Sequence, residues 1–214
     1  MMGVFRECTN PECTLRYPDL YNCESKITPC PMCAAPSVIV KQVKLIEEED
    51  HYHDFFHKDC NLIPVLENLR SVFNVGSIFR TVNGFGIQQI YLCGITPTPL
   101  HKNFSKTSLH AEKTIEWIYH KNSLDAVNNL RGKNFHIISL EMTDNSIPIF
   151  DLNRDMVTKK FALIVGNENF GIDPEIVDQS DLVVSIPMLG TKKSFNVCVA
   201  VGIALFQFYL LVKS

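Results

Sequence analysis

The cysteines near the N-terminus have the types and the spacing of a metal site. Cys8 and Cys13 form one pair, Cys30 and Cys33 form a second, and 16 residues separate the two pairs. Thiolates are soft ligands that favour zinc, and two short-spaced pairs can close a tetrahedral shell of four sulfurs. Because so short a segment buries too little apolar surface to fold unaided, the metal would supply much of its folding free energy. The pattern predicts a zinc ribbon over residues 1–40.

Other cysteine and histidine side chains leave two ligand questions open. Cys23 lies between the pairs and could replace one of the four ligands or simply pack beside them. A second cluster follows the ribbon and consists of His51, His53, His57 and Cys60. Its acidic surroundings favour a solvated, charged linker over residues 41–61, with a second metal site as the alternative.

The charge balance and the composition exclude little beyond disorder. The chain of 214 residues has a net charge of -3, and residues 41–60 alone carry 3 basic and 6 acidic side chains. The rest of the chain is therefore near neutral, and its charge excludes no nucleic-acid partner. A hydrophobic fraction of 46% is enough for a buried core and excludes a disordered protein. No basic segment leads an apolar stretch at the N-terminus, so we expect a cytoplasmic protein.

A first polar segment, residues 68–81, could bind an anion. Asn74 is a plausible cap for a helix over residues 74–85, and Arg70 and Arg80 bracket the start of that helix. Free N–H groups and the helix dipole favour an anion there, and arginine can hold a phosphate bidentately. Two ordinary surface arginines are the alternative interpretation.

Two later segments place polar groups at the ends of apolar strands. Gly166-Asn167-Glu168 follows an apolar run, and Asp173-Pro174 then opens a helix over residues 174–180. Ligands of open α/β sheets bind beyond the carboxyl ends of the strands, and Gly166 would let a ligand approach the backbone. The third segment joins residues 186–190 to Ser194 and Asn196 at the start of a very apolar stretch. The dinucleotide pattern G-x-G-x-x-G is absent.

The elements that must position these groups alternate along the chain. Near-continuous apolar runs predict strands over residues 90–92, 135–140, 161–165 and 182–186. Helical patterns fall over residues 74–85, 122–131 and 174–180, with Asn122 or Ser123 capping the second. This alternation predicts an α/β domain with a parallel sheet over residues 62–214.

The stretch over residues 195–212 has no formally charged side chain. Its length would suffice for a membrane span, but Asn196 and Gln207 lie inside it and no second span accompanies it. We expect a buried helix, covered partly by another subunit, and no membrane partner.

The three polar segments together resemble the SpoU/TrmH family of RNA 2'-O-ribose methyltransferases, within the SPOUT class. The matching residues are Asn74-x-Gly76-x3-Arg80-Thr81, Gly166-Asn167-Glu168-x2-Gly171, Ile186-Pro187-Met188-x-Gly190 and Ser194-Phe195-Asn196-Val197. The likeness covers about residues 62–214. Phe195 replaces the leucine usual in the family, and Cys198 takes a place often held by serine. The zinc ribbon is an extension that most members lack.

The resemblance implies an α/β domain with a deep trefoil knot, and a homodimer that contains the last helix in its interface. It implies S-adenosylmethionine as the cofactor, bound largely through main-chain groups. The corresponding residues here are Leu140, Gly166, Ile186, Met188 and Phe195.

The same resemblance implies transfer of a methyl group to a ribose 2'-OH in tRNA or rRNA. Arg80 would orient and activate the hydroxyl, and no metal is needed for the transfer. Because arginine is too basic to be the base itself, the adjacent phosphate would accept the proton. The residues expected to hold Arg80 and the ribose in line are Asn74, Glu168, Ser194 and Asn196.

Basic side chains offer several candidate RNA contacts. Arg70, Lys192 and Lys193 lie beside the motifs and are the preferred phosphate ligands. The segment over residues 97–113 also places Phe104 among basic side chains, which could stack a base or could be a solvated loop. Two other function classes stay open, a binding module on a catalytically inactive domain and a small-molecule methyltransferase.

Overall fold

The computed structural model describes residues 2–20, 28–44, 61–157 and 160–213 of the chain. It divides into two compact units, residues 1–51 and residues 52–214. Cys23 and the cluster of His51, His53, His57 and Cys60 lie outside the described residues.

The first unit is a small antiparallel sheet with the strand order β2-β1-β4-β3. Its strands are β1 (Met2–Cys8), β2 (Arg16–Leu20), β3 (Thr28–Pro29) and β4 (Pro36–Lys44). Among its described residues, the buried hydrophobic side chains are Val4, Cys8 and Cys30. The guanidinium of Arg6 is also buried, and its Nε donates to Asp19 Oδ2 at 2.8 Å. Such a small core has little apolar surface with which to stabilise the fold.

The last strand of this sheet continues four residues past the predicted end of the ribbon at residue 40. Lys41 pairs with Phe5, and the pairing continues to Lys44 opposite Met2. The charged linker predicted over residues 41–61 therefore begins as a strand, because backbone ladder bonds form whatever the side chains are. At its other end, Asn61 is the first residue of the next strand.

The second unit is built on a seven-stranded sheet with the order β7-β6-β5-β10-β8-β11-β9, and all its pairings are parallel. The strands are β5 (Asn61–Glu67), β6 (Gln89–Cys93), β7 (Glu116–His120), β8 (His136–Leu140), β9 (Ile147–Pro148), β10 (Lys160–Val165) and β11 (Leu182–Ser185). The predicted parallel α/β sheet is confirmed. Three strands were not predicted: β5, β7 and β9.

Pro64 explains why the sequence does not predict β5 as a strand. Proline lacks the N–H that a ladder needs, and it argues against a central strand. Here β5 is central, with Pro64 opposite Leu163 of β10, but its pairing with β6 begins only at Val65. At Pro64, β5 therefore pairs with β10 but not with β6.

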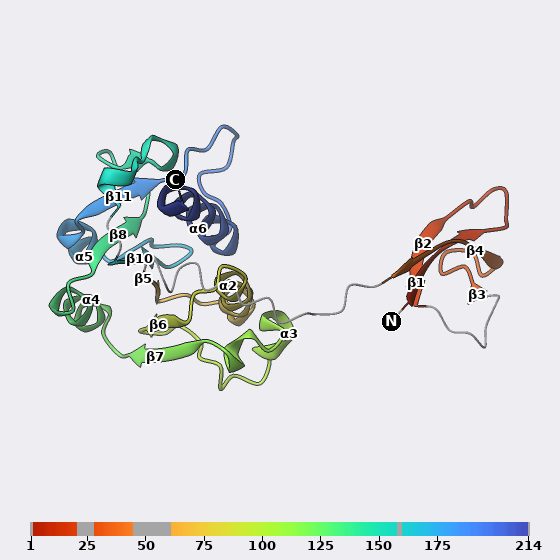
Figure 1. The fold of residues 1–214 in the computed structure, drawn as a ribbon, viewed down its shortest axis with the longest axis horizontal. Helices are drawn as coiled ribbons and strands as arrows, with labels where there is room; N and C mark the ends of the chain where they lie inside the picture. The colour runs from red at the N-terminus through yellow and green to blue at the C-terminus, as the bar shows by residue number, and fades with distance from the viewer. Residues whose placement is uncertain (1, 21–27, 45–60, 158–159, 214) are drawn as a thin grey trace. The chain divides into compact units, whose positions relative to one another are not determined.

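Helices cover both faces of the sheet. The helical elements are α2 (Val72–Gly84), α3 (Ser105–Ser108), η1 (Ala111–Lys113), α4 (Ser123–Gly132), η2 (Ile149–Asp151), η3 (Arg154–Met156), α5 (Pro174–Gln179) and α6 (Val197–Lys213). As Figure 1 shows, α2 and α6 lie on one side of the strands, and α4 and α5 lie on the other. Among the described residues, no helix combines the length and the apolar character that crossing a membrane requires.

The strands alternate between the two layers. In β10, Phe161, Leu163 and Val165 pack with α2 and α6, whereas Ala162 and Ile164 pack with α4 and α5. A sheet buried on both faces needs apolar side chains on both. This requirement is the physical reason that its strands read as continuous apolar runs.

The helix caps agree with the predictions in two cases out of three. Asn122 Oδ1 accepts from Leu124 N, and Asp173 Oδ1 accepts from Glu175 N with Pro174 next to it. The prediction for α2 is wrong, because Ser71 caps it and the helix begins at Val72. Asn74 is thus inside the first turn, where its backbone N–H donates to Ser71 Oγ at 3.2 Å and its side chain is free for another partner.

Candidate active site

The loops that follow β8, β10 and β11 meet the start of α6 around one pocket of about 460 Å³. This volume lies within the usual range for small-molecule sites, and the location is the carboxyl edge of the sheet. The pocket is lined by Leu140, Glu141, Met142, Val165, Gly166, Asn167, Glu168, Asn169, Phe170, Gly171, Ser185, Ile186, Lys193, Ser194, Phe195, Asn196, Val197 and Ala200.

Two glycines let the loop after β10 fold tightly. Asn167 and Gly171 exchange both backbone hydrogen bonds at 2.9 Å. A Cβ added at Gly166 would lie 2.3 Å from the backbone of Gly171, so no side chain fits there. The close approach of the Gly171 backbone by itself requires a glycine at position 166, and the approach of a ligand to Gly166 stays a prediction. Gly171 has a φ of +73°, a conformation that favours glycine.

Glu141 holds this loop from the neighbouring strand. Its Oε2 accepts from Ile172 N at 3.0 Å, and its Oε1 accepts from Met142 N at 3.0 Å. Sequence reasoning missed this residue. The available signal was its position, because a carboxylate directly after the apolar strand β8 lies at the ligand-binding edge.

Glu168 connects the same loop to the start of α2. Its carboxylate accepts from Arg70 N at 3.1 Å, from Ser71 N at 3.4 Å and from Asn74 Nδ2 at 3.0 Å. Partial burial raises the pKa of Glu168, but these bonds and its own backbone N–H outweigh that effect, so its pKa lies below the ordinary value. The residue is an ionised acceptor at neutral pH.

Asn74 extends the network to α6. Asn196 Nδ2 donates to Asn74 Oδ1 at 3.3 Å, and Asn196 Oδ1 accepts from Cys198 N at 2.9 Å. The Cys198 thiol donates to the Asn74 carbonyl oxygen at 3.2 Å, and burial raises its pKa. The structure thus brings Glu168, Asn74 and Asn196, one from each polar segment, into one hydrogen-bonded chain.

The predicted cofactor and RNA residues divide between the pocket and its surroundings. The structure places Leu140, Gly166, Ile186, Lys193, Ser194 and Phe195 on the pocket wall. Met188, Arg70, Arg80 and Lys192 are described but are not part of that wall. Arg80 in particular is an exposed residue of α2.

Phe104 is not a base platform. It is 1% exposed and packs edge-to-face on Phe79, with ring centroids 5.0 Å apart. The apolar side chain among the basic residues of this segment belongs to the core. Exposed basic side chains remain around it at Lys102, Lys106, His110 and Lys113.

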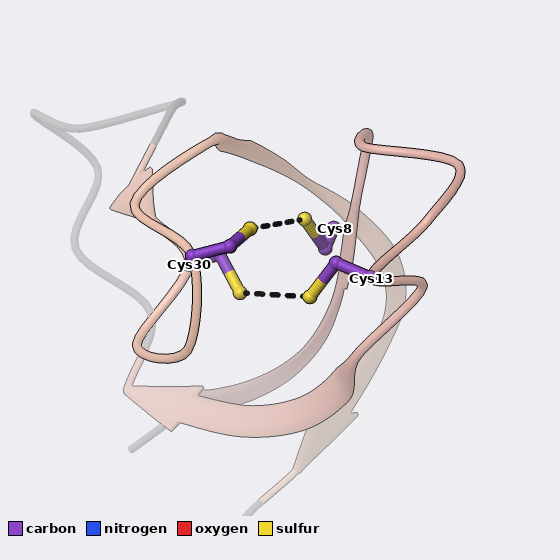
Figure 2. Close-up of side chains that lie close together, drawn as sticks. Cys8, Cys13 and Cys30 are labelled. Atoms are coloured by element: carbon purple, nitrogen blue, oxygen red, sulfur yellow. Dashed lines mark hydrogen bonds between the residues drawn. The ribbon is translucent and has the colours of Figure 1, made fainter.

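The four paired cysteines of the first unit converge on one point. Figure 2 shows the thiols of Cys8, Cys13 and Cys30 turned toward a common point. Cys8 Sγ lies 3.5 Å from Cys33 Sγ, and Cys13 Sγ lies 3.7 Å from Cys30 Sγ. All four sulfurs lie within 4.8 Å of one another. A tetrahedral zinc with bonds of ~2.3 Å needs sulfurs roughly 3.8 Å apart, so the cluster fits that ion.

The backbone supports the same interpretation. Each cysteine pair closes a turn whose next residue is left-handed, Thr14 with a φ of 50° and Ala34 with a φ of 61°. The N–H of Ala35 and the neighbouring thiols lower the pKa of Cys33 to about 7 against the opposing effect of burial, whereas burial raises the pKa of Cys8 to about 12. A thiolate is the form that binds zinc.

Comparison with known proteins agrees with this geometry. The sequence pattern of the SpoU rRNA Methylase family matches residues 61–206. The chain is 27% identical over 153 residues to the tRNA (guanosine(18)-2'-O)-methyltransferase of Aquifex aeolicus, covering 69% of this chain and 68% of that protein. It is 28% identical over 146 residues to the 23S rRNA (guanosine-2'-O-)-methyltransferase RlmB of Neisseria meningitidis, covering 68% and 57%. The chain spans 62% of the length of the matching Escherichia coli tRNA enzyme.

Solved structures show the same fold. The A. aeolicus TrmH/SpoU tRNA modifying enzyme superposes with a TM-score of 0.65 at 25% identity, covering 74% of this chain and 80% of that one. The AdoMet-bound rRNA methyltransferase of Sinorhizobium meliloti superposes with a TM-score of 0.65 at 21% identity, covering 82% and 63%. The knot that the resemblance implies stays a prediction. With a family match over more than half its length and the three polar segments joined at one pocket, the chain belongs to the SpoU rRNA methylase family.

Proposed function

We propose that this protein is an S-adenosylmethionine-dependent RNA methyltransferase that modifies a ribose 2'-OH in tRNA or rRNA. The observation that carries the proposal is the chain of hydrogen bonds from Glu168 through Asn74 to Asn196. It joins the three polar segments beside a pocket of suitable size. The activities of the tRNA and rRNA relatives support the same reaction.

The pocket is the proposed cofactor site. The residues that would hold S-adenosylmethionine on the pocket wall are Leu140, Gly166, Ile186 and Phe195. Met188, two residues after Ile186, would complete the set. The cofactor supplies an activated sulfonium methyl group when bound. Glu141 and Glu168 give the pocket two carboxylates, which suit a cationic ligand.

Arg80 is the proposed activator of the hydroxyl, and its position favours a dimeric site. Gly76, four residues before it, packs on α3, and Thr81 faces Gly202 of α6. Arg80 lies between these two contacts and is exposed, outside the pocket of its own chain. We therefore place it at a subunit interface, where it can reach the pocket of the other subunit.

The exposed apolar side of α6 supports that dimer. Val199, Phe206 and Leu210 are each about half exposed and recur at a helical spacing. Large apolar side chains in such a row are typical of an interaction surface. We propose that two copies of this helix face each other, as predicted from the uncharged stretch.

The remaining polar side chains around the pocket would position the RNA. Ser194 and Asn196 line the pocket where the ribose would enter, and Lys193 lies beside them as a phosphate ligand. Arg70 and Lys192 are exposed next to the site and extend the phosphate-binding surface. With the hydroxyl held in line, the neighbouring phosphate accepts its proton.

Zinc at Cys8, Cys13, Cys30 and Cys33 is proposed as a structural ion, because four thiolates leave no open position for chemistry. The cytoplasm is the proposed location, since tRNA and rRNA are found there.

Methyl transfer from tritium-labelled S-adenosylmethionine into total tRNA and total rRNA tests the function. For Arg80→Ala, we expect transfer to fall about 100-fold or more, with cofactor affinity unchanged. Arg154→Ala is the matched control, because Arg154 is also exposed but lies in η3. Transfer by Arg80→Ala near the wild-type rate would contradict the role of Arg80. No labelling of any RNA by the wild-type protein would contradict the function itself.

A further inference from the structure

Phe170 is a large apolar side chain held almost fully in solvent. It is 88% exposed, although it belongs to the tightly folded loop after β10. Its backbone N–H donates to Asn167 Oδ1 at 3.1 Å, and the paired Asn167 and Gly171 close the loop on either side. The ring is therefore presented by an ordered backbone rather than by a free chain end.

Asn167 fixes the loop to the body of the domain. Its side chain is 8% exposed, and its Nδ2 donates to the carbonyl oxygen of Asn68 at 2.6 Å. On the same loop, Glu168 is bound by the start of α2. Because these hydrogen bonds fix the loop, binding to Phe170 has little ordering entropy to overcome.

The neighbours of Phe170 indicate what it binds. Phe170 and Lys193 both line the pocket, but they come from different loops, after β10 and after β11. An aromatic face together with a cation is what single-stranded RNA needs, because bases stack on the ring and phosphates bind the ammonium group. A 2'-OH that enters this pocket brings its own base, or the next one, to the rim where Phe170 lies.

We infer that Phe170 is a stacking platform for an unpaired RNA base at the mouth of the cofactor pocket. This inference rests on the proposed function and goes beyond it by assigning base contact to a residue outside the methyl-transfer network. Stacking accepts every base, so Phe170 contributes affinity and position rather than sequence choice.

The test compares three variants of the full-length, zinc-loaded protein for binding to total tRNA and total rRNA. Phe170→Ala removes the ring, and Phe170→Trp keeps an aromatic face. Phe150→Ala is the matched control, because Phe150 is 64% exposed but does not line the pocket. We expect Phe170→Ala to weaken RNA binding about tenfold, within the range measured for base stacking. The other two variants should stay within about twofold of the wild type, and cofactor affinity should not change in any of them.

Each contrary outcome is distinguishable. Equal RNA affinity for Phe170→Ala and wild type overturns the inference and leaves the proposed function intact if wild-type labelling of RNA continues. Loss of cofactor affinity in Phe170→Ala would mean that the ring contacts the cofactor. A change in the oligomeric state of this variant would mean that the ring contacts a second copy of the chain. Either result overturns the inference. Absence of RNA labelling by the wild type is a failure of the proposed function, and it is measured before any variant is compared.

Discussion

The two units of this chain hold their chemical groups in place in opposite ways. In the second unit, two apolar layers on either side of a parallel sheet support the pocket, and hydrogen bonds between loops finish it. In the first unit, the described buried hydrophobic side chains are Val4 and two of the four clustered cysteines themselves. The pocket of the second unit is thus a product of its fold, and we propose that the metal site of the first unit is a condition for its fold.

The largest expected effect comes from removing the metal. If four thiolates stabilise the first unit, chelation of zinc or Cys30→Ser should unfold the ribbon while the thermal transition of the second unit stays unchanged. Circular dichroism with limited proteolysis of the full-length protein would measure both. Cys93→Ser is the control for the loss of a buried thiol elsewhere. A ribbon that resists proteolysis after complete zinc removal would abolish the contrast between the units.

An intermediate effect is expected from Gly166→Ala. The added Cβ would meet the backbone of Gly171, so the loop after β10 must shift at a cost of about 1–3 kcal/mol. Cofactor affinity should fall by tenfold or more, as measured by isothermal titration calorimetry, while zinc content stays the same. Gly190→Ala is the matched control, since an added Cβ meets nothing within 4 Å there. Equal cofactor affinity for both variants would show that this loop does not form the site.

The smallest expected effect concerns the carboxylate of Glu168. Its pKa is lowered in the folded protein, so its stabilising contribution is present at neutral pH. That contribution is lost as the pH falls below about 4, because the folded state must then take up a proton against three donors. The side chain is exposed, so solvent screening keeps the effect below about 1 kcal/mol.

Thermal melts between pH 7 and pH 3 would measure this contribution. The difference in stability between wild type and Glu168→Gln should shrink as the pH falls. Glu175→Gln, at another exposed glutamate, is the control and should show no such trend. A difference that stays constant with pH would mean that the charge of Glu168 does not hold the loop.

Particular residues show where sequence reasoning is sufficient. The sequence alone predicted the cysteine cluster, the buried strands β8 and β10, and the helix cap at Asp173. Each depends on residue types within a few positions, and such local patterns carry their own physical cause. The motif residues Asn74, Glu168 and Asn196 were found through a resemblance, not through spacing alone.

Other residues could not be read without the fold. Phe104 and Phe170 are both aromatic side chains beside polar neighbours, yet one is 1% exposed and the other 88%. The difference depends on whether another element packs over the ring, and Phe79 of α2 does so only for Phe104. Likewise, Glu141 holds the loop after β10 only because the backbone N–H of Ile172 lies 3.0 Å from its carboxylate.

By itself, the sequence determined a cysteine site, an α/β domain and three segments that carry the polar candidate residues. Each of these follows from thiolate spacing, apolar runs or helix caps, which act over short distances along the chain. Only the tertiary structure decided that Glu168, Asn74 and Asn196 touch, that Arg80 lies outside its own pocket and that Phe170 faces solvent. These contacts join residues up to 122 positions apart. Their geometry follows from the order in which the parallel strands pair, which no local pattern contains.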